Sequence, residues 1–164
     1  NELMSSHKPQ RLLDFQARAR HHRQVVLVGP LAKELPPPEL LGDSAIMAVD
    51  GGSLLAAPEN FHYALGDGDS GRATDLDELW PTGKDTSDLA LALARIPEEV
   101  QRVHLWGFWG ARMDHHLCNL GEVHQFLLIH TAHVFFHGPD EHPMLAYPAG
   151  EHAFELNGTF STLC

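Results

Sequence analysis

Short apolar runs that end directly on aspartate and glycine constrain the fold of this chain more than any other feature. Residues 45–49 lead into Asp50-Gly51-Gly52, and residues 62–65 lead into Gly66-Asp67-Gly68-Asp69-Ser70. Residues 25–28 form a third such run, closed by a Gly-Pro pair. Runs of this length and composition are typical of strands buried in a parallel sheet. In an open α/β sheet, ligands bind at the carboxyl ends of the strands, which is where these aspartates fall.

The rest of the pattern predicts an α/β fold: an open, mostly parallel sheet flanked by helices in a Rossmann-like three-layer arrangement. We expect helices within residues 1–24, over 89–96 and over 113–130, and further strands over 103–107 and 133–136. Asp85 or Thr86 would cap the middle helix. After residue 144 the pattern changes to short strand-like segments at 144–147, 153–156 and 159–163, which predicts the start of an all-β C-terminal domain.

Length and charge exclude several classes of protein. The chain has 164 residues, about the length of one domain, and carries 11 basic against 22 acidic residues, for a net charge of −11. This balance argues against a nucleic-acid-binding protein. No apolar run approaches the roughly 20 residues of a membrane-spanning helix, and the polar start does not resemble a signal peptide. Two cysteines without a CxxC pair fit the reducing cytosol, so we expect a cytoplasmic protein.

Asp67 and Asp69, on either side of Gly68, are the sharpest candidate site. Glycine lets the backbone come close to a ligand, and two carboxylates suit a hard cation such as Mg²⁺ that carries polyphosphate oxygens. The alternative is an ordinary Asp/Gly turn after a strand. Asp50-Gly51-Gly52 has a similar alternative, a tight turn in which the aspartate caps a helix.

Two later segments add candidate anion ligands. In Lys84-Asp85-Thr86-Ser87-Asp88, Lys84 is a possible phosphate contact, although the segment is also a good helix N-terminus. Residues 107–115 form a loop of small residues at the start of a helix, where backbone N–H groups can bind an anion and Arg112 can fork onto phosphate. A plain strand-to-helix loop is the alternative there.

Together and in this order, the four segments resemble the thiamine pyrophosphokinase family, whose pattern is (A/V)DGG, GDxDS, KDxTD and GxxGGRxDHxLxN. The resemblance covers roughly residues 24–137. It implies an N-terminal extension over 1–23, a catalytic α/β domain over 24–148, and the beginning of a C-terminal β domain over 149–164. In the family that second domain helps to bind thiamine and to build the dimer.

The activity implied by the resemblance is Mg²⁺-dependent transfer of pyrophosphate from ATP to the hydroxyl of thiamine, which gives thiamine diphosphate and AMP. The partners would be ATP, thiamine and a second subunit in a homodimer, without nucleic acid or membrane. Asp67 and Asp69 would hold Mg²⁺, and Asp50 and Asp85 would act through water or orient the alcohol. The residues implied in nucleotide binding or in supporting it are Gly51, Gly52, Ser70, Lys84, Asp88, Gly110, Arg112, Asp114, His115 and Asn119.

Three departures from the family pattern keep two alternatives open. Gly68 stands where the family usually has a bulky residue, the segment between residues 70 and 84 is short, and we expect only the beginning of the second, all-β domain in these 164 residues. Ala111 also stands where a glycine is usual. The alternatives are a pyrophosphokinase for another small alcohol, such as a hydroxymethylpterin, and a non-catalytic relative that binds nucleotide or thiamine phosphates.

Overall fold

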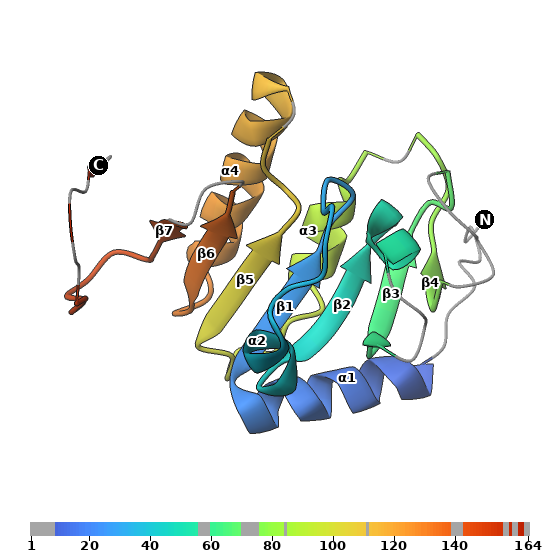
Figure 1. The fold of residues 1–164 in the computed structure, drawn as a ribbon, viewed down its shortest axis with the longest axis horizontal. Coiled ribbons are helices and arrows are strands. Elements are labelled where there is room, and N and C mark those ends of the chain that lie inside the picture. The colour runs from blue at the N-terminus through green and yellow to red at the C-terminus, as the bar shows by residue number, and fades with distance from the viewer. Residues whose placement is uncertain are drawn as a thin grey trace.

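A seven-stranded sheet dominates the part of the chain that the computed structural model describes, which is residues 9–55, 60–69, 76–83, 85–110, 112–138, 143–155, 158 and 161–162 (Figure 1). Its strand order is β4-β3-β2-β1-β5-β6-β7, and every neighbouring pair is parallel except β6 and β7. The predicted open, mostly parallel sheet is therefore confirmed. The strands are β1 (Gln24–Val28), β2 (Ala45–Val49), β3 (Tyr63–Gly66), β4 (Glu78–Leu79), β5 (Arg102–Trp106), β6 (His133–His137) and β7 (Met144–Ala146).

Helices pack on both faces of the sheet. They are α1 (Pro9–His22), α2 (Pro38–Gly42), the 3-10 helix η1 (Asp50–Leu55), α3 (Asp88–Leu93) and α4 (Met113–Leu127). In Figure 1, α3 and α4 lie behind the sheet, α2 lies in front of it, and α1 runs across the end where the strands begin. No helix in the described ranges is long and apolar enough to cross a membrane.

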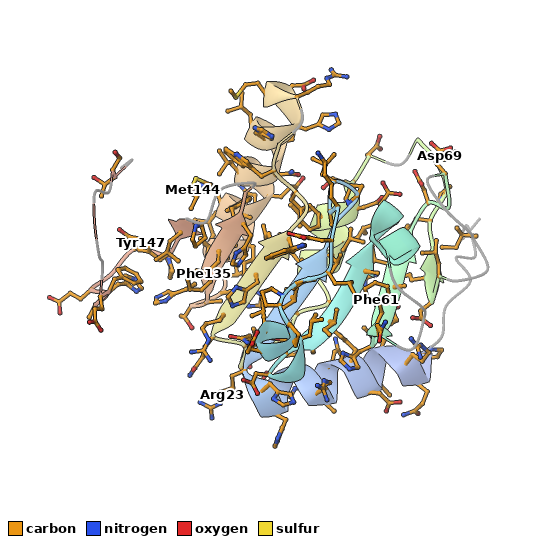
Figure 2. All side chains as sticks on the ribbon, viewed as in Figure 1. Arg23, Phe61, Asp69, Phe135, Met144 and Tyr147 are labelled. Atoms are coloured by element: carbon orange, nitrogen blue, oxygen red, sulfur yellow. The ribbon has the colours of Figure 1, made fainter. Side chains whose placement is uncertain are left out.

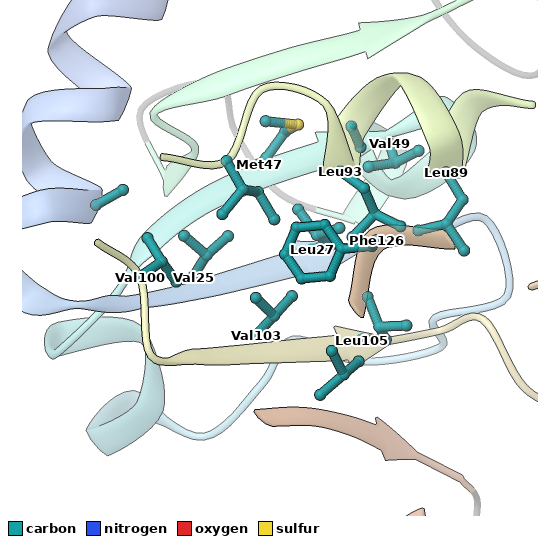
Figure 3. Close-up of a cluster of buried hydrophobic side chains, with 14 of the residues drawn as sticks. Val25, Leu27, Met47, Val49, Leu89, Leu93, Val100, Val103, Leu105 and Phe126 are labelled. Carbon is teal, nitrogen blue, oxygen red and sulfur yellow. The ribbon is translucent and has the colours of Figure 1, made fainter. Parts of the chain in front are cut away.

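The larger core fills the space between the sheet and helices α1, α3 and α4. Leu27, Met47 and Leu105 point from three adjacent strands toward Leu93 of α3 and Phe126 of α4 (Figure 3). A smaller core on the opposite face packs alternate residues of β1, β2 and β3 against α2 and the loop that precedes it. Because both faces are covered, all five residues of β1 and of β2 are buried.

The N-terminal helix belongs to this packing. Phe15 and Ala19 of α1 are completely buried, and Phe15 lies near Tyr63 of β3 with ring centroids 6.1 Å apart. Burying a phenylalanine side chain contributes about 1.5–3 kcal/mol to stability. Arg11 also forms an ion pair with Asp77 at 2.6 Å. The helix predicted within residues 1–24 is thus present over residues 9–22 and is tied to the sheet.

Edge strand β4, which the sequence pattern does not predict, lies within the short segment between residues 70 and 84. Glu78 is 1% exposed and accepts hydrogen bonds from Tyr63 Oη at 2.7 Å, Trp80 Nε1 at 2.8 Å and Arg95 Nε at 3.1 Å. Burial raises the pKa of Glu78, but the hydrogen bonds from Arg95 and Tyr63 outweigh it and leave that pKa below its ordinary value. The strand depends on this buried network, which a local apolar pattern does not reveal.

Two further local predictions are corrected. Helix α3 is capped by Ser87, whose Oγ accepts the Ala90 N–H at 3.1 Å, and not by Asp85 or Thr86. The first short strand of the C-terminal segment is confirmed as β7. The described residues of the next two, 153–155 and 161–162, are not in strands, and the remaining positions of those predictions lie outside the described residues.

A chain of hydrogen bonds crosses the face of the sheet beside α2. Arg102 Nε, which can only donate, binds Gln24 Oε1 at 2.8 Å, so the Gln24 amide nitrogen faces Ser44 Oγ at 2.9 Å. His104 Nε2 also donates to Gln24 Oε1 at 3.3 Å, which leaves His104 Nδ1 to accept from His137 Nε2 at 2.8 Å. His104 must therefore be neutral, because its Nδ1 needs a free lone pair to accept this hydrogen bond.

We predict that the protein loses stability between pH 7.5 and pH 5. Burial, followed by the charges of neighbouring cations, lowers the pKa of His62 to about 4 and that of His104 to about 3. His62 Nδ1 accepts the Ile46 N–H at 2.9 Å, so its protonation breaks a hydrogen bond as well. The unfolded chain takes up protons below about pH 6.5 while the folded chain does not, which costs on the order of 1–2 kcal/mol per histidine at pH 5.

Urea unfolding at the two pH values measures this loss. The variant His104→Gln is expected to show a smaller difference between pH 7.5 and pH 5 than the parent protein. His124→Gln, which changes an exposed histidine of α4, serves as the control with an unchanged difference. Equal stability of the parent protein at both pH values would contradict the prediction.

Candidate functional site

Three carboxylates meet at the carboxyl edge of the sheet. Asp50 follows β2 and Asp67 follows β3, and these strands are parallel neighbours with Val49 opposite Leu65. Asp88 comes from the first turn of α3. One oxygen from each of the three carboxylates lies within 4.8 Å of the others, and all three side chains are half-buried. No other such group of three appears among the residues that the structure describes.

Close backbone packing brings Asp50 to this position. Asp50 itself has a positive φ of 52°, and η1 folds directly onto the end of β1. A Cβ atom on Gly52 would lie 2.0 Å from the carbonyl oxygen of Val28, so no other residue fits there. Gly51 is likewise buried in this turn. The Asp50-Gly51-Gly52 segment is therefore a turn whose glycines let Asp50 sit beside Asp67.

The structure places Asp69 and Asp85 differently from these three aspartates. Asp69 is exposed at the edge of the sheet, and its backbone N–H donates to Asp67 Oδ1 at 3.0 Å (Figure 2). Its contribution to the group is thus a main-chain contact that orients Asp67. Asp85 is also exposed and is not among the three. Ser70 and Lys84 lie outside the described residues.

Electrostatic repulsion within the group favours a bound cation. Two carboxylates about 4.8 Å apart repel each other by about 3 kcal/mol at an effective dielectric constant of about 20. A divalent cation between them reverses the sign of this interaction. Carboxylate oxygens are ligands for hard cations, and Mg²⁺ needs only one or two of them beside water and phosphate oxygens. Asp50, Asp67 and Asp88 therefore fit a Mg²⁺ site that leaves coordination positions for a phosphorylated ligand.

The strand order reverses next to this group. Chain connections run from β1 toward β4 on one side and from β5 toward β7 on the other, so the reversal lies between β1 and β5. The loops after these strands are bonded together, with Gly29 N–H donating to the Trp106 carbonyl at 2.7 Å and Leu31 N–H to the Gly107 carbonyl at 2.9 Å. Open α/β sheets bind ligands at such a reversal. These loops lie at the same edge of the sheet as the carboxylate group.

The loop from Gly107 to Gly110 is held by side chains of α4. Asn119 Nδ2 donates to the Phe108 carbonyl at 3.0 Å, and Gly110 N–H donates to His116 Nε2 at 2.9 Å. The N–H of Gly110, which we expected to be available for an anion, is thus used within the protein. Sequence analysis missed His116, because the motif singles out its neighbour His115, which is exposed.

Arg112, the expected phosphate ligand, pairs with Asp114 at the start of α4. Arg112 Nη2 lies 2.5 Å from Asp114 Oδ2, and Arg112 Nε lies 3.1 Å from Asp114 Oδ1. This pairing, with the His115 N–H as a smaller contribution, lowers the pKa of Asp114. Both side chains are exposed, at 74% and 57%. An exposed ion pair contributes little to stability, so phosphate can replace Asp114 as the partner of the guanidinium.

We predict that Mg²⁺ raises the unfolding temperature of the protein through Asp50, Asp67 and Asp88. A ligand that binds only the native state raises the free energy of unfolding by RT ln(1 + [L]/Kd), where [L] is the free ligand concentration. Millimolar Mg²⁺ is the ligand used here. Asp88→Asn is expected to remove this increase, whereas Asp85→Asn, the matched exposed control, retains it. An increase that survives Asp88→Asn but disappears in Asp69→Asn would instead support a site made by Asp67 and Asp69.

Comparison with known proteins identifies the fold. No protein-family model matches the chain, and no curated protein matches it. Among solved structures, it resembles the thiamin pyrophosphokinase of Geobacillus thermodenitrificans, with 26% identity and a TM-score of 0.53 over 69% of this chain and 58% of that one. Weaker matches are the thiamine pyrophosphokinase of Bacillus subtilis and a probable one of Staphylococcus saprophyticus. They have identities of 20% and 19%, TM-scores of 0.46 and 0.49, 69% coverage of this chain, and 59% and 63% coverage of theirs.

The matched region therefore spans less than two thirds of each of these structures. The conclusion about the fold rests on the Geobacillus structure, whose TM-score exceeds 0.5. The chain has the α/β fold of the thiamine pyrophosphokinase family.

Proposed function

We propose that this protein is a thiamine pyrophosphokinase that transfers pyrophosphate from ATP to the hydroxyl of thiamine, with Mg²⁺ as cofactor, and releases AMP. The observation that carries the proposal is the meeting of Asp50, Asp67 and Asp88 at the carboxyl edge of a sheet with this fold. A cation held there would lie at the same edge of the sheet as the loops after β1 and β5, where a nucleotide would extend its phosphates.

In the proposed reaction the protein positions the two substrates and neutralises the phosphate charge, and it forms no covalent intermediate. The hydroxyl oxygen of thiamine attacks the β-phosphorus of ATP, the bond from that phosphorus to the α-phosphate oxygen breaks, and the hydroxyl proton leaves to solvent or a carboxylate. When bound, Mg²⁺ supplies neutralisation of the phosphate charge. Asp50, Asp67 and Asp88 would hold it, and the loop from Gly107 to Gly110 would position the nucleotide.

The remaining residues keep supporting roles in this proposal. Arg112 would exchange Asp114 for phosphate oxygens, and Lys84 would add a second cation. Ser70, Asp69 and Asp85 would shape the loops around the metal, with Asp85 as a candidate to orient the alcohol. We further propose a cytoplasmic homodimer, in which the α/β domain over 24–148 binds ATP and the segment from 149 onward contributes to the thiamine pocket.

A nucleotide-binding relative without transferase activity is the second candidate. The observation that favours it is the pairing of Arg112, whose guanidinium already donates two hydrogen bonds to Asp114. Such a protein would bind ATP or thiamine phosphates at the same edge of the sheet. Activity, and not binding, separates the two candidates.

We predict that the protein forms AMP from ATP only when both thiamine and Mg²⁺ are present. Chromatography of the nucleotides after incubation, with thiamine diphosphate measured in parallel, tests this. Asp88→Asn and Asp67→Asn are expected to lower the rate by about 100-fold or more, because each removes charge next to the metal. ATP binding without AMP in the presence of thiamine would favour the binding protein, and AMP with a hydroxymethylpterin alone would favour another acceptor.

A second kinetic prediction concerns the ion pair on α4. Arg112→Ala is expected to raise the KM for ATP by about tenfold, because it removes one charge-assisted hydrogen bond to phosphate, whose free energy corresponds to about that factor in affinity. Asp114→Asn frees the guanidinium and is expected to keep or lower the KM. Steady-state measurements on the two variants and the double variant provide the comparison. An unchanged KM in Arg112→Ala would mean that the guanidinium contacts only Asp114.

A further inference from the structure

The turn between β5 and α4 is fixed by two side chains from one face of α4. His116 and Asn119 are three residues apart, so they project on the same side of the helix. One accepts the N–H of Gly110 and the other donates to the carbonyl of Phe108. Both polar main-chain groups therefore face the helix. The loop at the end of β5 is thus held by two side chains of α4.

Burial and ring stacking restrict the side chain of His116 to one position, unlike that of a histidine on the surface. Its side chain is 7% exposed, and its ring stacks on Trp109 with centroids 4.2 Å apart and planes 10° apart. A backbone N–H can only donate, so Nε2 carries the lone pair and the neutral ring has its proton on Nδ1. Stacking fixes the plane of the ring, and the hydrogen bond fixes the direction of the Gly110 N–H.

Gly110 needs such a partner because its backbone is otherwise permissive. Its φ is 110°, which an L side chain rarely adopts, and no atom lies within 4 Å of the position that a Cβ would take. No neighbouring side chain therefore packs against Gly110 on that side. The hydrogen bond to His116 holds the peptide between Trp109 and Gly110 in the orientation seen in the structure.

We propose that His116 is a positioning residue for the nucleotide site. By orienting the Trp109–Gly110 peptide, it sets where the chain enters α4 and therefore where Arg112 stands relative to Asp50, Asp67 and Asp88. The inference rests on the proposed function, because it assumes that this loop contacts the nucleotide. His116 acts through the loop and does not itself touch the substrate.

Two substitutions separate the hydrogen bond from the stacking. His116→Phe keeps an aromatic ring against Trp109 and removes the acceptor, while His116→Gln keeps an acceptor at a similar reach and removes the ring. The KM for MgATP is expected to rise by about five- to tenfold in His116→Phe and to stay within about twofold of the parent in His116→Gln. The rate at saturation is expected to change less than the KM in both variants.

Amide hydrogen exchange of Gly110, followed by nitrogen-15 NMR without any ligand, provides a second readout. The amide is expected to be protected in the parent and in His116→Gln, and to exchange at least tenfold faster in His116→Phe. Thermal unfolding checks that each variant is folded. If His116→Phe does not fold, His116→Met supplies the same loss of the acceptor with a flexible side chain.

The outcomes distinguish this inference from the proposed function. Protection of the Gly110 amide that persists in a folded variant without the acceptor would overturn the inference. So would equal losses in His116→Gln and His116→Phe that follow their loss of thermal stability, since packing alone would explain them. A parent protein that does not bind MgATP would refute the proposed function and with it the nucleotide role of His116, while the amide exchange would still show whether His116 orders the loop.

Discussion

Parallel pairing of β1, β2 and β3 is the constraint on which the candidate site depends. It sends three consecutive strands to the same edge of the sheet, so Asp50 and Asp67 arrive side by side although 17 positions separate them. The packing of Gly52 on the end of β1 then leaves little room for Asp50 to move away. The protein thus holds like charges together by main-chain packing, and a cation bound there would offset the resulting repulsion.

Much of this arrangement can be predicted from local sequence. β1 and β2 are continuous apolar runs because both of their faces are covered, and helix α4 has an apolar stripe, so each is visible as a pattern. Edge strand β4 is not visible, because burial of Glu78 depends on Arg95, 17 residues later, and on Tyr63 of another strand. A pattern of neighbouring residues carries no information about such a partner.

The candidate metal ligands show the same limit. The sequence favours Asp67 with Asp69, which are two residues apart, whereas the structure groups Asp67 with Asp50 and Asp88. Gly68 has a φ of 76°, and Asp69 beyond it is exposed. Proximity along a turn is therefore a poor guide to which carboxylates share a cation. His116 escaped notice for a related reason, since its partner is the main chain of Gly110 and no residue type signals that contact.

The buried carboxylate of Glu78 also bears on how the sheet ends. Strand β4 is two residues long, and its inward charge is matched by Arg95 from the end of α3. Removing Arg95 would leave the buried carboxylate of Glu78 without its cationic partner, at a cost of about 3–5 kcal/mol. A strand from another molecule could pair with only the two residues of β4 at this edge, and the Glu78–Arg95 ion pair holds β4 in place. The edge beside the candidate site is thereby protected against intermolecular strand addition and the aggregation that follows from it.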